Sequence, residues 1–160
     1  MIRLSLTAAV AATVLLLGAA PALAGKTEDA FLSKLQGMWS GSGLLTGDET
    51  GKVDCTMTIR QREEGVNFRG KCDAGDFGPQ SFSGVVSYND AAGRYEAKSQ
   101  GDVTLGVKEG NSVVFTIALK GIATGTSVMK LSQSKAVIDT VVNRPGSKGG
   151  VIKSHMVLTK

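Results

Sequence analysis

Apolar and polar residues alternate along most of this chain, and the alternation predicts short β-strands. From residue 38 onward, runs rich in Val, Thr, Phe and Tyr recur between clusters of Gly, Asn and Asp, without a helical period. These runs place strands at residues 38 to 46, 53 to 59, 66 to 72, 80 to 88, 94 to 100, 102 to 108, 112 to 120, 125 to 132, 135 to 142 and 150 to 159. The sequence therefore predicts an all-β domain of about ten strands.

Tight turns between neighbouring strands favour an antiparallel meander. Closing that meander into a barrel would remove the exposed strand edges that invite aggregation. A two-sheet sandwich remains the alternative, because the pattern does not show whether the first and last strands pair. Residues 27 to 36 predict a short helix ahead of the strands, with Thr27 as its cap and Phe31, Leu32 and Leu35 on one face. This helix would plug one end of a barrel.

The clearest hairpin joins residues 53 to 59 with residues 66 to 72, and it brings the two cysteines together. With the turn centred on Glu63 and Glu64, positions whose numbers sum to 127 pair across the hairpin, so that Cys55 faces Cys72. A bulge at Gly65 would shift this register. An even pair of cysteines in an oxidising compartment is expected to form a disulfide.

The first 24 residues have the pattern of a cleaved secretory signal peptide. A basic Arg3 precedes an apolar stretch over residues 4 to 20, and the small residues around Ala22 and Ala24 suit a cleavage site. An uncleaved membrane anchor is the alternative, but those 17 residues are fewer than the roughly 20 that span a bilayer. We expect cleavage after Ala24, a periplasmic or secreted location, and one β-barrel domain over residues 25 to 160.

The charge of the chain indicates no particular partner. The formal net charge is +4, of which Arg3 would leave with the signal peptide, and the basic residues are interspersed with acidic ones. Because exported proteins rarely meet nucleic acid, we expect no nucleic-acid partner. Gly25 rather than Cys follows the expected cleavage site, so we expect no membrane anchor after processing.

A short motif at the start of the first strand resembles the opening of a known fold. The run Gly37-Met38-Trp39-Ser40-Gly41-Ser42-Gly43 is similar to the Gly-x-Trp opening of lipocalins and other calycin-like β-barrels. The resemblance implies that Trp39 packs across the barrel floor. The longer pattern, with its two cysteines and Gly-rich strands, resembles a group of uncharacterised exported proteobacterial proteins, which implies no known activity.

Two characterised families share parts of this pattern. Nitrobindin-like haem barrels resemble the chain at Trp39, Gly41, Gly43 and His155, and that resemblance would imply an inward His155 as haem ligand. The alternation predicts the opposite, because His155 shares its face with Lys153 while Met156 belongs to the apolar face. Small-barrel protease inhibitors secreted by bacteria also resemble the chain, but no reactive segment can be matched.

The chain lacks the motifs of most catalytic and metal sites. It has one histidine, and its two cysteines are expected in a disulfide, so a zinc site has too few ligands. Ser42 follows Gly41 on a strand rather than at the elbow of a hydrolase. We therefore expect no enzyme activity, no metal and no cofactor.

The inward apolar positions predict a non-catalytic barrel that binds a small apolar ligand. Small residues at Gly41, Gly43, Gly70, Gly84 and Ala97 either leave an internal cavity or relieve crowding where strands bend. The alternative function is a periplasmic interaction module, such as an inhibitor of a protease or cell-wall hydrolase, using loops 75 to 80 or 143 to 150. The positions predicted to line the ligand site are Trp39, Met57, Phe68, Phe82, Tyr88, Tyr95, Leu105, Phe115, Met129 and Met156.

Overall fold

The computed structural model describes residues 24 to 75, 78 to 119, 124 to 143 and 150 to 160. Except for Ala24, the expected signal peptide lies outside the described residues, and so do parts of the two expected interaction loops, residues 76 to 77 and 144 to 149. No helix within the described ranges is long and apolar enough to cross a membrane.

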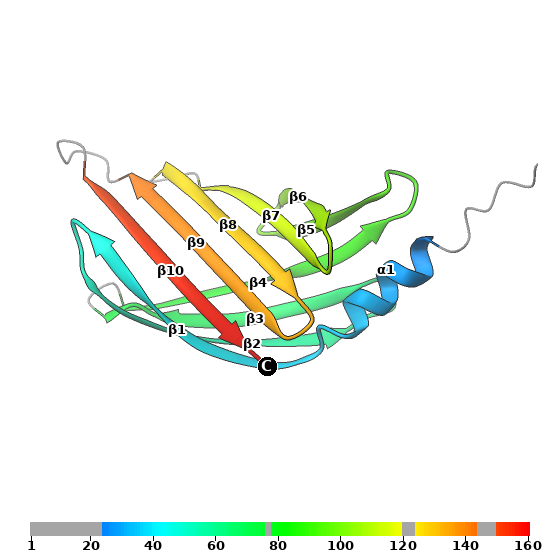
Figure 1. Cartoon of the computed structure of the whole chain (residues 1–160), viewed down its shortest axis with the longest axis horizontal. Helices are drawn as coiled ribbons and strands as arrows, with labels where there is room; N and C mark the ends of the chain where they lie inside the picture. Colours follow the sequence, from blue (N-terminus) through cyan, green and yellow to red (C-terminus); the bar gives the residue numbers. More distant parts are fainter. Residues whose placement is uncertain (1–23, 76–77, 120–123, 144–149) are drawn as a thin grey trace, which may run out of the picture.

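One helix and ten strands make up the described chain (Figure 1). The elements are α1 (Ala24–Ser33), β1 (Gly37–Gly47), β2 (Gly51–Gln61), β3 (Val66–Asp73), β4 (Pro79–Asn89), β5 (Arg94–Ser99), β6 (Asp102–Glu109), β7 (Ser112–Leu119), β8 (Thr124–Ser132), β9 (Lys135–Asn143) and β10 (Val151–Thr159). Both ends of every strand lie within two residues of the prediction. The alternation of apolar and polar residues therefore predicted the strands correctly.

The strands form a closed antiparallel barrel in which every neighbour in sequence is a neighbour in space. β1 pairs with β2 on one side and with β10 on the other, where Gly41 is opposite Leu158 and Gly43 is opposite Met156. This pairing of first and last strands decides between the two predicted architectures. The barrel is confirmed, and the sandwich alternative is wrong.

Helix α1 lies at one end of the barrel (Figure 1). It begins three residues before the predicted start, so Thr27 lies inside the helix and is not its cap. After Ser33 the chain continues in tight turns, in which the Leu35 amide donates to the Leu32 carbonyl at 3.0 Å. Both leucines are completely buried in the core, so the helix closes this end with its apolar face.

Trp39 packs beneath the helix, at the place that the resemblance to calycin-like barrels implied. Its indole ring is buried, and Nε1 donates a hydrogen bond of 2.9 Å to the carbonyl oxygen of Leu35. The Lys160 ammonium lies 5.9 Å from the centre of the ring and donates to the Lys34 carbonyl at 2.7 Å. The last residue of the chain thus also covers this end.

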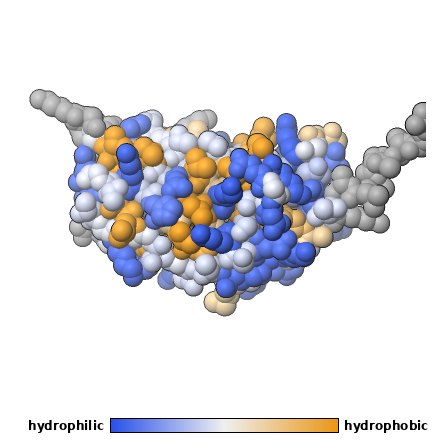
Figure 2. Space-filling view, in the orientation of Figure 1, coloured by the Kyte–Doolittle hydropathy of each residue, from blue (hydrophilic) through white to orange (hydrophobic). Residues whose placement is uncertain are grey.

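The outer surface is mixed in character. Figure 2 shows hydrophobic residues on one face in several small groups, separated by hydrophilic ones. Leu105 belongs to the outside, because its neighbour Gly106 pairs with the inward residues Tyr95 and Phe115 while Leu105 is 48% exposed. The prediction that Leu105 lines the interior is wrong, since β6 carries apolar residues on its outward face.

Candidate functional site

The inward side chains of the described strands are fully buried near α1 and partly exposed toward the other end. The largest fully buried side chains gather near α1, and they are Trp39, Tyr95, Phe115, Leu32, Leu35, Leu158, Val66 and Val113. Apolar residues that pack against this core but stay partly exposed include Leu45, Phe68, Phe82, Ile117, Met129, Ile138 and Met156. We call the half of the interior away from α1 the open half, because its apolar side chains are only partly buried, and the end that α1 closes the sealed end.

Aromatic rings fill the space beside two of the inward glycines. Gly84 is opposite Phe68, and a Cβ built on Gly84 would stand 2.6 Å from Cζ of that ring. Phe82 lies over Gly70 in the same way, two pairs along the same two strands. These glycines therefore relieve crowding and leave no cavity, which settles two of the positions left open by the sequence.

The glycines of β1 permit a close approach of its neighbours. A Cβ on Gly41 would stand 2.8 Å from the Leu158 Cα on β10, and Gly43 is equally close to Met156. Because β1 has no side chains here, Cys55 from β2 reaches Met156 from β10, with 3.4 Å between the two sulfur atoms. Side chains of β2 and β10, the two neighbours of β1, therefore meet over β1 inside the barrel.

The two cysteines form the predicted disulfide. Cys55 on β2 pairs directly with Cys72 on β3, and Ile59 pairs with Phe68 in the same register. The pairing sum of 127 holds along the hairpin, so Gly65 introduces no shift. The bridge ties two neighbouring strands on the inward face.

A row of hydroxyl side chains crosses the wall of the open half. Ser127 on β8 pairs with Thr140 on β9, and Thr140 pairs with Ser154 on β10. All three alternate in phase with buried inward residues such as Leu131, and the Ser127 and Thr140 hydroxyl oxygens lie 2.9 Å apart. We call these three residues the hydroxyl row.

The sealed end contains a buried polar network that attaches α1 to the barrel. The Tyr95 hydroxyl donates to the Glu28 carboxylate, and Lys108 Nζ lies 2.6 Å from Glu28 Oε1. Phe31 packs edge-on against Tyr95, with 5.8 Å between the ring centres. Since Glu28 is buried and fully partnered, this carboxylate serves the docking of the helix.

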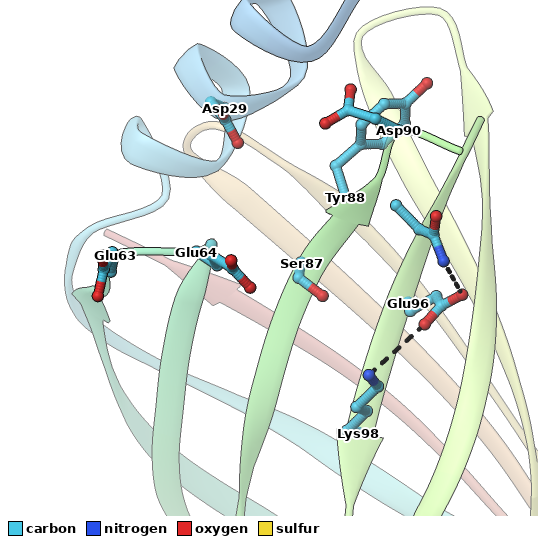
Figure 3. A pocket seen from close by; sticks show the side chains of 10 residues that line it. Asp29, Glu63, Glu64, Ser87, Tyr88, Asp90, Glu96 and Lys98 are labelled. Atoms are coloured by element: carbon cyan, nitrogen blue, oxygen red, sulfur yellow. Dashed lines mark hydrogen bonds and ion pairs between the residues drawn. The ribbon is translucent and has the colours of Figure 1, made fainter. Parts of the chain in front are cut away.

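An acidic cleft of about 370 Å³ lies between α1, the β2–β3 turn and the start of β5 (Figure 3). Its carboxylates are Asp29, Glu63, Glu64, Asp90 and Glu96. The hydrogen bond from Asn89, at 3.0 Å, holds the pKa of Glu96 below its ordinary value of 4.5, and Arg94 and Lys98 act in the same direction against burial. Among the described residues, no group of three or more potential metal ligands is close enough to hold a metal ion.

A second hollow lies on the outer face of β1, β10 and β9, and it contains His155. The side chain of His155 is 63% exposed, and Nδ1 lies 2.6 Å from Asp139 Oδ1. Exposed Leu44 lines the same hollow. His155 therefore points away from the barrel interior, as the alternation predicted, and the haem alternative loses the inward ligand that it required.

Nine of the ten residues predicted to line the interior lie on its inward face, although they fall into two groups. Trp39, Tyr95 and Phe115 are fully buried at the sealed end, whereas Phe82 and Met129 border the open half. Sequence reasoning missed the hydroxyl row, since Ser and Thr in a strand read as polar and outward. The one feature of the sequence that could have revealed the row is the alternation along each strand, because each of the three residues lies two positions from an apolar inward residue.

Comparisons with known proteins identify the fold. No protein-family model and no curated protein matches the chain. Among solved structures, it is similar to an S-type phycobiliprotein lyase, CPES, from Guillardia theta, with a TM-score of 0.57 at 13% sequence identity. The alignment covers 85% of this chain and 96% of that one.

At that identity the likeness shows the fold alone. The chain is thus a closed antiparallel barrel of ten strands, similar in fold to this lyase, and the all-β barrel predicted from the sequence is confirmed. The resemblance to one group of exported bacterial proteins stays a prediction.

Proposed function

We propose that this protein binds a small apolar ligand in the open half of its barrel and performs no chemistry on it. One observation carries the proposal: apolar inward side chains such as Phe82, Met129 and Ile138 are packed on the core yet remain partly exposed to solvent. Binding sites for small molecules are concave and mostly apolar, and the mouth of a β-barrel is a common place for them. The similar fold of the phycobiliprotein lyase is consistent with a barrel that serves as a scaffold for a small-molecule site.

The proposal includes export. The signal-peptide pattern of residues 1 to 24 and the disulfide between Cys55 and Cys72 both suit an oxidising compartment. The absence of a catalytic role is proposed because both buried carboxylates of the described residues are partnered away from the open half. Tyr95 and Lys108 hold Glu28, and Asn89 and Arg94 hold Glu96.

A neutral fluorescent dye tests the proposal directly. N-phenyl-1-naphthylamine is expected to bind with an increase in emission, and Leu45→Trp, which places a larger side chain at the open half, is expected to weaken binding about tenfold. Leu44→Trp makes the same change on the outer face, where Leu44 is exposed, and should leave binding unchanged. Both variants must keep the thermal midpoint of the parent. A parent that does not bind the dye, or equal losses in both variants, would overturn the proposal.

A second candidate function rests on the outer face of β6. Val103, Leu105 and Val107 form a row of exposed apolar side chains, and such rows on sheet surfaces mark protein contacts. The alternative function predicted from the sequence, an interaction module, requires a protein partner. We propose that such a partner would contact this row. Substituting all three with Thr would abolish capture of an envelope protein while leaving dye binding intact.

A further inference from the structure

We infer that the ligand is uncharged and that it carries a hydroxyl or a similar hydrogen-bonding group, which the hydroxyl row receives. This inference rests on the proposed function, because it names the class of ligand for the same open half. A long-chain alcohol represents the class, and the fatty acid of equal chain length represents the class that the site rejects.

The charges on the inward face support a neutral ligand. Among the inward positions of the described strands, two carry a charge, and neither offers a free cation to the open half. Lys108 is bound to Glu28 at the sealed end, and Asp102, the exposed first residue of β6, is an acid. A ligand carboxylate in the open half would therefore meet apolar side chains and hydroxyls and would find no inward cation from a strand.

The cost of desolvation favours a neutral ligand over an ionised one. Moving an ionised carboxylate out of water without a cationic partner costs far more free energy than moving a hydroxyl that exchanges water for another hydroxyl. The cation on the neighbouring outer face does not help, because Lys153 lies on the opposite side of β10. The wall of the barrel separates it from the ligand.

The hydroxyl row has hydrogen-bonding capacity to spare. A Ser or Thr hydroxyl donates one hydrogen bond and accepts up to two, and the contact between Ser127 and Thr140 uses one donor. Ser154 is partly buried beside Thr140 and has no side-chain hydrogen bond to any other described residue. The row therefore offers donors and acceptors to one neutral polar group, while Leu45 and Ile117, next in the same register, offer apolar contact.

Competition against the bound dye tests the inference on the full mature chain. At about pH 8 decanoic acid is ionised, and 1-decanol is expected to displace N-phenyl-1-naphthylamine at a concentration at least about tenfold lower than decanoate does. As the pH falls below the carboxyl pKa, decanoic acid should approach the alcohol in apparent affinity. Ser154→Ala should weaken displacement by decanol about fivefold with no effect on the dye, and Ser42→Ala, on the outward face of β1, should change neither.

The outcomes separate this inference from the proposed function. If the dye itself does not bind, the proposed function fails and the inference falls with it. If the dye binds and decanoate displaces it as well as decanol, or neither displaces it, the proposed function stands and the neutral class is wrong. Equal effects of Ser154→Ala and Ser42→Ala would exclude the hydroxyl row as the receiving group.

Discussion

The ring of Phe68 on β3 occupies the space that a side chain at Gly84 on β4 would need. The two residues are direct partners in the ladder, and Phe82 lies over Gly70 on the same pair of strands. Two phenyl rings thus cover two glycines, with 6.3 Å between the ring centres. The two rings therefore occupy the space on the inward face of β3 and β4, and the hydroxyl row lies on the other side of the barrel, on β8, β9 and β10.

The first prediction concerns Gly84. Gly84→Ala would force its Cβ to within 2.6 Å of Phe68 Cζ, and we expect a loss of about 1 to 3 kcal/mol in the free energy of unfolding, as for other overpacked cores. Urea unfolding followed by Trp39 fluorescence measures it. Gly51→Ala is the matched control, because a Cβ there meets no atom within 4 Å. Equal stability of the two variants would contradict the packing described.

The second prediction concerns the disulfide. The bridge closes a sequence separation of 17 residues, and replacing both cysteines with Ser is expected to lower the free energy of unfolding by about 3 kcal/mol through the greater freedom of the unfolded chain. Reduction of the parent protein should lower its free energy of unfolding, measured in urea, by the same amount. A midpoint indifferent to reductant would show that the bridge adds no stability.

The third prediction concerns the pH dependence of stability at Glu96. The folded pKa of this carboxyl is below its ordinary value, chiefly because Asn89 donates a hydrogen bond to the ionised form. Ionised Glu96 therefore stabilises the fold above its unfolded pKa, and the contribution is lost as the pH falls through the folded value, below 4.5.

The difference in unfolding free energy between the parent and Glu96→Gln is accordingly expected to be present at neutral pH and to vanish in acid. Glu64→Gln, in the same cleft, controls for the change in net charge. A difference that is the same at both pH values would rule out this linkage.

The fourth prediction concerns the outward face of β6. Leu105→Thr is expected to change the free energy of unfolding by less than about 0.5 kcal/mol, because Leu105 contributes to no core contact. Phe115→Ala, at the buried position that pairs with Gly106, should lose about 3 to 5 kcal/mol. Thermal melts of the two variants check the assignment of faces, and a large loss from Leu105→Thr would reverse it.

The sequence predicted the strands well because their alternation is a local property of each run. The register of β2 against β3 followed from one turn and was confirmed from Cys55 to Ile59. Leu105 was misplaced for a physical reason: Gly106, the inward residue beside it, has no side chain, so the apolar residues of β6 mark its outward face. Which residues of β6 point inward is shown only by their pairing with residues of the neighbouring strands.

The candidate site was harder to predict than the fold. Glu28 and Lys108 are 80 residues apart, and only the docking of α1 brings them together. The hydroxyl row likewise depends on three registers at once, and no single run of sequence contains it. Whether inward glycines leave a cavity depended on which rings lie opposite them, which alternation alone does not give.

The closure of the barrel also sets the order in which the chain can fold. Residues of β1 such as Ser42 pair with residues of β10 such as Val157, which are synthesised more than a hundred positions later. The first strand has one open edge until the last has been made, so the fold cannot be completed on a partly finished chain. Until β10 has been made, the backbone groups along one edge of β1 have no strand to pair with.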